Sequence, residues 1–121
     1  MNEREQTVRL WFDMWLQAED RGITSIFAPD CIYTESWGPE YHSAAQVKHW
    51  FEEWNTRGRV LVWDILRFFH AENHTAVEWR FKNQMLDGRV EEFDGFSLIR
   101  WTADGKIASL KEFGCNIHTY D

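Results

Sequence analysis

The Asp-Gly dipeptides at residues 87–88 and 104–105 divide the second half of the chain into long runs that lack any helical pattern. In one run, residues alternate between the two faces of an expected strand. One face would carry Thr75, Val77, Trp79 and Phe81, and the other Ala76, Glu78, Arg80 and Lys82. This period of two is typical of a β-strand. Asp87-Gly88 and Asp104-Gly105 are strong signals for the tight turns that join antiparallel strands. We therefore expect antiparallel strands at residues 59–70, 75–85, 90–102 and 106–118.

The first half of the chain shows a helical repeat instead. The apolar residues with this spacing are Val8, Trp11, Phe12, Trp15 and Leu16. Gly22 can end this first helix, and Ser43 can cap another at residues 44–55. A short helix at 23–27, a strand at 31–36 and a loop at 37–40 are expected between them. The order predicts an α+β fold, in which a cone-shaped, curved antiparallel sheet packs against N-terminal helices.

Size and charge limit the class of protein. A chain of 121 residues fits a single domain, residues 1–121. Its net charge of −7 argues against nucleic acid as a partner, because phosphate would be repelled. The apolar runs, such as residues 60–63, are far shorter than a membrane helix, so no membrane partner is expected. The polar N-terminus shows no signal region, which predicts a cytoplasmic protein with Cys31 and Cys115 reduced.

The aromatic content is unusual. There are 8 Trp, 9 Phe and 3 Tyr, and aromatic residues make up 17% of the chain. A core rarely needs eight indoles, because each carries an N–H that requires a partner when buried. We expect the rings to line a pocket for a small hydrophobic, ring-containing molecule, although each ring taken singly could be ordinary core. The tryptophans expected to bind this ligand are Trp11, Trp15, Trp37, Trp50, Trp54, Trp63 and Trp79.

Several segments in order resemble the NTF2-like superfamily, which has a cystatin-like architecture and includes SnoaL-like polyketide cyclases and ketosteroid isomerases. The segments are Ile26-Phe27-Ala28-Pro29-Asp30, residues 37–51, Val77-Glu78-Trp79, Asp104-Gly105-Lys106-Ile107 and Phe113-Gly114-Cys115-Asn116-Ile117. The resemblance covers nearly the whole chain and implies the cone-shaped fold. It implies no single activity, because this fold serves isomerases, cyclases, dehydratases, hydrolases and non-catalytic binders.

The resemblance implies that Glu35 is a catalytic general base, because it falls at the end of the first strand. Cys31, Tyr33 and Glu35 share one face of that strand. Loss of water around Glu35 among Trp15, Trp37 and Trp63 should raise its pKa above the ordinary value of about 4.3. The alternative is a carboxylate at the rim that pairs with an arginine or lysine.

Two other isomerase positions differ from the family pattern. Trp11 stands where the isomerases have a tyrosine, and Ser97 stands where they have a protonated aspartate. The resemblance thus implies that Ser97 also contacts the ligand, although an indole N–H and a hydroxyl would make a weak oxyanion hole. Two functions therefore stay open. One is a cofactor-independent isomerase, cyclase or lyase that uses Glu35, and the other is a non-catalytic ligand-binding or accessory dimerisation module.

No metal or other cofactor is expected. The five histidines are His42, His49, His70, His74 and His118, and the pair spaced like zinc ligands flanks a turn instead of lying on a helix. The sequence contains neither a nucleophile elbow nor a phosphate-binding loop.

The outer face of the sheet is expected to hold a homodimer together. The apolar residues assigned to it are Phe68, Val90, Phe96 and Leu98, which are too hydrophobic for a fully solvated surface. The charged residues Glu78, Arg80 and Glu112 lie mid-strand and could belong either to this outer face or to a polar cluster inside. The outer face is the expected place for Arg80 and Lys82.

Overall fold

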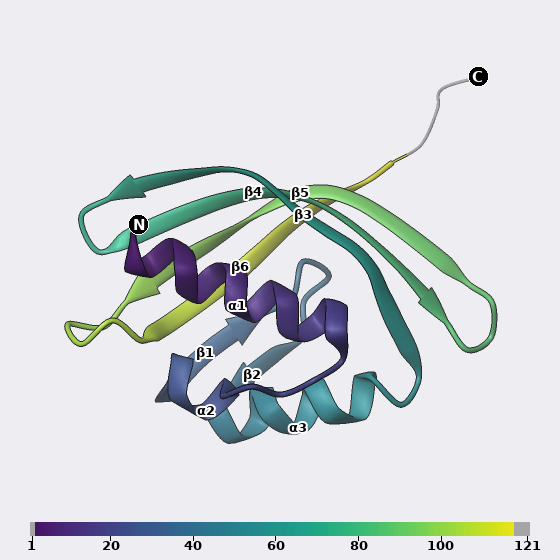
Figure 1. The fold of residues 1–121 in the computed structure, drawn as a ribbon, viewed down its shortest axis with the longest axis horizontal. Coiled ribbons are helices and arrows are strands. Elements are labelled where there is room, and N and C mark those ends of the chain that lie inside the picture. Colours follow the sequence, from purple (N-terminus) through teal and green to yellow (C-terminus); the bar gives the residue numbers. More distant parts are fainter. Residues whose placement is uncertain (1, 118–121) are drawn as a thin grey trace.

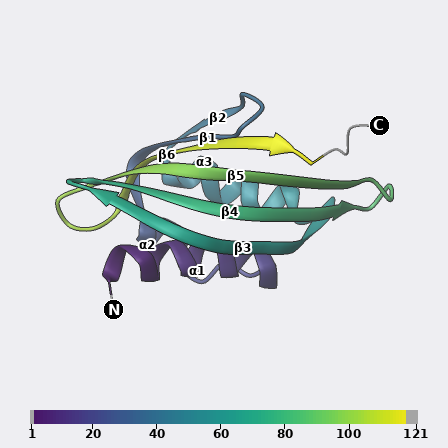
Figure 2. The same ribbon diagram turned by 90° about the horizontal axis from the view of Figure 1, so that it is seen from above.

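A curved sheet arches over three helices in the computed structural model, which describes residues 2–117 (Figure 1). Its elements are α1 (Glu3–Gln17), α2 (Ile23–Ile26), β1 (Phe27–Thr34), β2 (Glu40–His42), α3 (Ala44–Trp54), β3 (Gly58–Ala71), β4 (His74–Met85), β5 (Val90–Trp101) and β6 (Ile107–Asn116). The strands form one sheet in the order β2-β1-β6-β5-β4-β3. Seen from above, the helices lie on one face of this unclosed sheet (Figure 2). The expected α+β architecture is confirmed.

The helix ends follow local capping. The side chain of Asn2 accepts hydrogen bonds from the backbone N–H groups of Arg4 and Glu5, which starts α1. The helix ends at Ala18, which adopts a left-handed conformation with φ of 55°. Gly22 is therefore not the stop that the sequence predicted, and it precedes α2 instead. Ser43 caps α3 as predicted, because its hydroxyl accepts the N–H of Gln46 at 3.0 Å.

Strands β3 to β6 form the predicted antiparallel meander. Gly88 and Gly105 have φ of 91° and 84° in the two turns, a region that favours glycine. The edge of the sheet differs from the expectation, because β1 begins at Phe27, inside the expected second helix, and pairs in parallel with β6. The short strand β2 lies at residues expected to be partly loop. His118, the expected end of the last strand, falls outside the described residues.

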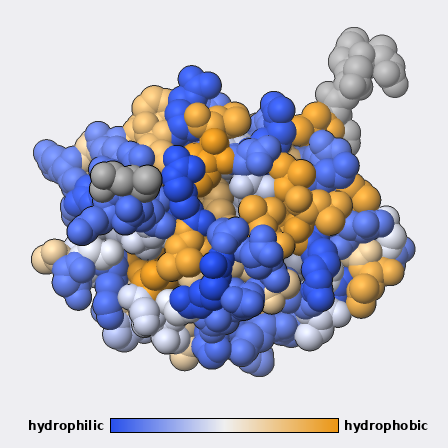
Figure 3. Space-filling model, viewed as in Figure 1, coloured by the Kyte–Doolittle hydropathy of each residue, from blue (hydrophilic) through white to orange (hydrophobic). Residues whose placement is uncertain are grey.

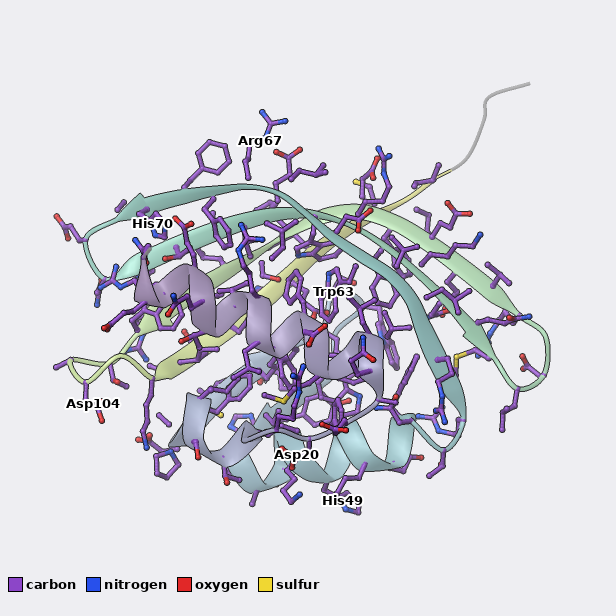
Figure 4. All side chains as sticks on the ribbon, viewed as in Figure 1. Asp20, His49, Trp63, Arg67, His70 and Asp104 are labelled. Carbon is purple, nitrogen blue, oxygen red and sulfur yellow. The ribbon has the colours of Figure 1, made fainter. Side chains whose placement is uncertain are left out.

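The two faces of the sheet are sharply different. Thr75, Val77 and Trp79 are buried against the helices, as the alternation predicted. The outer face carries ion pairs, which join Arg67 to Glu78, Arg80 to Asp94 and Lys82 to Glu92. Arg67 points away from the helices in Figure 4. Arg80 is therefore on the outer face, as expected.

Phe68 does not belong to the outer face to which the sequence pattern assigned it. A bulge between Ile65 and Arg67 shifts the alternation of β3, so Phe68 pairs with the inward-facing Val77. The guanidinium of Arg9 on α1 lies 5.2 Å from the centre of the Phe68 ring. Figure 3 shows hydrophobic residues gathered over the middle of the face seen in Figure 1, among hydrophilic ones.

Gly95 on β5 lies very close to the backbone of β6 and to the ring of Trp79. A Cβ atom added there would lie 2.2 Å from the carbonyl oxygen of Phe113, 2.8 Å from the Trp79 ring and 3.0 Å from the Cα of Gly114. Only glycine fits this approach without movement of the backbone.

No helix in residues 2–117 combines the length and the apolar character needed to cross a bilayer. Cys31, which is buried, and Cys115, which is exposed, are both free thiols.

Candidate functional site

A cavity of about 120 Å³ lies between the helices and the inner face of the sheet. Its lining residues are Trp15, Glu35, Ser36, Trp37, Trp50, Trp54, Val60, Trp63, Trp79, Phe81, Asn83, Glu91, Phe93 and Glu112. It shares half of these residues with a wider outer cleft of about 900 Å³, which gives it an entrance. Because one buried water needs roughly 10–15 Å³, the inner cavity has room for a small organic molecule.

Tryptophan rings from four elements form the apolar part of this lining. The ring centre of Trp15 on α1 lies 5.0 Å from that of Trp50 and 5.4 Å from that of Trp54, both on α3. On the sheet side, the ring centres of Trp63 and Trp79 are 5.9 Å apart. Figure 4 shows Trp63 between α1 and the sheet. These rings meet edge-on or tilted, which is a favourable arrangement for aromatic pairs.

The structure brings together six of the seven tryptophans expected to bind ligand, all except Trp11. Trp37 is at the mouth of the cavity and is 78% exposed. Trp11 is fully buried beside Trp15, with its ring against Phe27 and Tyr33. It belongs to the core, because Phe27 and Tyr33 of β1 cover its ring one turn of α1 before Trp15.

Ser97 is also absent from the cavity lining. It is fully buried on β5, and its hydroxyl accepts a hydrogen bond of 2.9 Å from the indole N–H of Trp79. Its role in the structure is to satisfy a buried donor. An oxyanion hole built from Trp11 and Ser97 is therefore not present at this cavity.

Glu35 follows directly after β1 and lines both the cavity and the outer cleft. Burial raises the pKa of its carboxyl group, which the hydrogen bonds from Tyr41 and Trp37 partly oppose. The Tyr41 hydroxyl donates this hydrogen bond over 2.7 Å. The direction of the pKa shift is the predicted one. Within residues 2–117 no arginine or lysine forms an ion pair with Glu35, so the alternative of a paired rim carboxylate is not observed.

Glu112 on β6 is the second carboxyl group of the cavity, and the sequence pattern left its face undecided. The buried hydroxyl of Tyr33 donates a hydrogen bond to its carboxyl group. Burial raises the pKa of Glu112 to about 8, and the nearby charge of Glu35 acts in the same direction. Glu112 is therefore mostly a neutral acid at pH 7. Burial and Glu112 also raise the pKa of Tyr33, which keeps its proton.

Asn83 and Glu91 complete the polar part of the lining, and sequence reasoning missed both. They face each other across β4 and β5, and the Asn83 amide donates to the Glu91 carboxyl at 3.2 Å. The Asn83 carbonyl oxygen is buried and has no partner in the described part of the chain. A signal for Asn83 did exist, because the period of two that places Trp79 and Phe81 inward also places Asn83 inward.

The chemistry available here is proton transfer. Two neighbouring carboxyl groups do not both ionise readily, and Glu112 is the one that retains its proton. One can then act as a base while the other donates a hydrogen bond. The described residues hold no group of three or more His, Cys, Asp or Glu side chains placed to bind a metal ion.

Comparison with solved structures shows which fold this is. An NTF2-like protein from Burkholderia pseudomallei superposes with a TM-score of 0.80 at 16% identity, over 95% of this chain and 92% of that one. A candidate isomerase from Bacillus subtilis gives 0.81 at 15% identity, over 95% and 90%. An epoxide hydrolase from M. tuberculosis gives 0.81 at 11% identity, over 93% and 83%.

Sequence comparison shows the family. No curated protein matches the chain significantly. The profile of the SnoaL-like domain matches residues 8–110. The chain therefore belongs to the SnoaL-like domain family.

Proposed function

We propose that this protein is a cofactor-independent enzyme that moves a proton on a small, largely apolar, ring-bearing molecule held in the aromatic cavity. The reaction class is isomerisation, cyclisation or elimination. The observation that carries the proposal is the pair of carboxyl groups of Glu35 and Glu112, which line one cavity and have unequal tendencies to ionise. A pair of this kind supplies a base and an acid at the same pH.

In the proposed reaction, Glu35 removes a proton from a carbon next to a carbonyl group of the substrate. The electron pair of that C–H bond moves toward the carbonyl oxygen, which gains negative charge. The neutral carboxyl group of Glu112 donates a hydrogen bond to this oxygen, because its own proton is retained at pH 7. Glu35 then returns the proton to another carbon, or the enolate reacts further within the substrate.

The residues behind the pair hold it in place. Tyr41 donates to Glu35, which orients that carboxylate toward the cavity. Tyr33 donates to Glu112, which fixes that side chain beneath the tryptophan rings. The rings exclude water, so charge that develops on the substrate is felt more strongly than in solution. The isomerase and hydrolase among the similar folds are compatible with chemistry in such a cavity.

The test is exchange of carbon-bound hydrogen with solvent. Cyclohexanone is incubated with the protein in deuterated buffer, and loss of the proton signal beside the carbonyl is followed by NMR. We expect the wild type to accelerate exchange, and Glu35→Gln to lower the rate by roughly 100-fold or more. Glu92→Gln is the matched control, because Glu92 lies on the outer face beside Lys82. Equal rates for the wild type and Glu35→Gln would contradict the proposal.

A non-catalytic binding module is the second candidate. It is favoured by the position of Trp11 and Ser97, which leaves this cavity without the two oxyanion donors expected from the family pattern. In that case cyclohexanone would quench tryptophan fluorescence, and neither the wild type nor Glu35→Gln would accelerate exchange. An accessory dimerisation role would leave both signals unchanged.

A further inference from the structure

The cavity is acidic as well as aromatic. Three carboxyl groups line it, those of Glu35, Glu91 and Glu112, and no lysine, arginine or histidine does so within residues 2–117. We infer that the molecule bound in this cavity carries a positive charge on a small alkylated ammonium group. This inference rests on the proposed function, because it names the charge of the substrate at the same site.

The tryptophan faces supply one half of the recognition. Trp15, Trp50 and Trp54 line the cavity from the helices, and Trp63 and Trp79 line it from the sheet. The face of an indole ring is electron-rich, and it attracts a cation that lies within about 6 Å of its centre. Alkylated ammonium groups suit such a site, because their methyl groups are apolar and cost little to remove from water. A compact cation of this kind also suits a cavity of about 120 Å³.

The carboxyl groups supply the other half. Burial of acidic groups beside rings costs free energy unless a charge or hydrogen bond compensates it. Tyr41 and Tyr33 compensate one oxygen each of Glu35 and Glu112. A neutral ligand would add no opposite charge to these acids, and an anion would be repelled by them. A cation stabilises the ionised form of Glu35 and, as the pH rises toward 8, that of Glu112.

The basic residues nearby do not neutralise the cavity. Arg57 and Arg89 line the outer cleft and not the inner cavity. Arg57 is held by Glu53 through two hydrogen bonds of 2.9 Å each. The positive charge of Arg57 is therefore largely compensated by Glu53, and Arg89 lies outside the inner cavity.

The experiment compares choline with neohexyl alcohol, its neutral analogue in which carbon replaces nitrogen. Binding of each to the wild type is measured by calorimetry and by quenching of tryptophan fluorescence. We expect choline to bind roughly tenfold more tightly or better. Equal or weaker binding of choline, or no binding of it at millimolar concentration, would overturn the inference.

Adjacent residues on β5 give a matched pair of variants. Glu91→Gln removes an acid from the cavity, whereas Glu92→Gln removes one from the outer face. We expect Glu91→Gln to weaken choline several-fold and to leave neohexyl alcohol unchanged, which also shows that the variant is folded. Glu92→Gln should change neither affinity. An equal loss of choline affinity in both variants would contradict a charge acting inside the cavity.

The pH dependence gives a second signature. The titratable groups that face Glu112 or share its cavity are Tyr33, Glu35, Tyr41 and Glu91, and His49, Glu53, Arg57 and Arg89 line the adjoining cleft. A cation favours the ionised acid, so choline affinity should rise as the pH increases toward about 8 and then level off. Neohexyl alcohol should show no rise, and Glu112→Gln should remove most of the rise for choline. A rise that persists in Glu112→Gln would contradict this part of the inference.

The two proposals fail separately. Choline preference without any hydrogen exchange on cyclohexanone would support the cationic ligand and overturn the enzyme. Exchange that depends on Glu35, with no preference for choline over neohexyl alcohol, would support the enzyme and overturn the cationic ligand.

Discussion

Replacement of Glu112 by glutamine should stabilise the fold at alkaline pH and leave it almost unchanged in acid. The glutamine side chain keeps the shape of the protonated acid and can still accept the hydrogen bond from Tyr33. The pKa of Glu112 is about 8 in the folded protein, compared with an ordinary value of 4.5. Between these two values the folded protein holds a proton that the unfolded chain has lost. The wild type therefore loses stability as the pH rises through this window.

The magnitude follows from the width of the window. The pKa difference is 8 − 4.5, or 3.5. Each pKa unit corresponds to about 1.36 kcal/mol, which sets an upper limit near ~5 kcal/mol. Water that enters around the ionised group, and coupling to Glu35, reduce this figure. We expect Glu112→Gln to be more stable than the wild type by roughly 2–5 kcal/mol above pH 8, and by close to zero at pH 4.

Urea unfolding, followed by tryptophan fluorescence at a series of pH values, measures this difference directly. Other groups titrate as well, so the informative quantity is the difference between the wild type and Glu112→Gln at each pH. Glu92→Gln provides the control for removal of one negative charge, and its difference from the wild type should stay small throughout. A Glu112→Gln protein whose advantage is the same at pH 4 and pH 9, or which is less stable at pH 9, would refute the argument.

Three further outcomes are expected. Gly95→Ala should lower the free energy of unfolding by about 3 kcal/mol or more in urea titration, because its Cβ would lie 2.2 Å from the Phe113 carbonyl oxygen; a loss below 1 kcal/mol would show that the backbone yields easily. Ser97→Ala should cost roughly 1–3 kcal/mol, because it leaves the buried indole N–H of Trp79 without its acceptor; Glu35-dependent exchange should persist in that variant. The protein should sediment as a homodimer through its outer sheet face, where Phe96 stacks on Phe113 with ring centres 4.8 Å apart. Phe96→Lys should shift it toward monomer, and a wild type of 14.6 kDa in solution would remove this prediction.

The meander and the aromatic cavity could be predicted because each depends on a local pattern. The period of two in β4 places Trp79 inward, and Asp-Gly pairs fix the turns. The helical spacing of Trp50 and Trp54 similarly places both rings on one face of α3. When the apolar face of α3 lies opposite the inner face of β4, these rings lie between the helices and the sheet.

The proximity of Glu35 and Glu112 could not be predicted, because it depends on strand pairing between segments that are distant in the sequence. Glu112 faces inward opposite the buried Ser97 in the β5–β6 hairpin, but only the parallel register between β1 and β6 brings it to the segment that carries Glu35, and no short-range pattern specifies that register. Phe68 was misplaced for a related reason, since a single bulge reverses the side of the strand on which all later residues lie. Trp11 shares the helical face of Trp15, but the curvature of the core decides which ring meets the cavity.

The parallel contact between β1 and β6 also determines when Glu35 and Glu112 can come together during folding. Glu112 lies on β6, which pairs with β5 as the last strand of the meander, so the β3–β6 meander can form while the cavity still lacks Glu35 from the first part of the chain. The ladder between β1 and β6 is short and is interrupted by an irregularity between Phe27 and Ile32. Long-range pairings of this kind form late, because the loop-closure entropy must be overcome first. Under the proposed function, hydrogen exchange on a ketone would therefore report that β1 has joined β6 and that the sheet is complete.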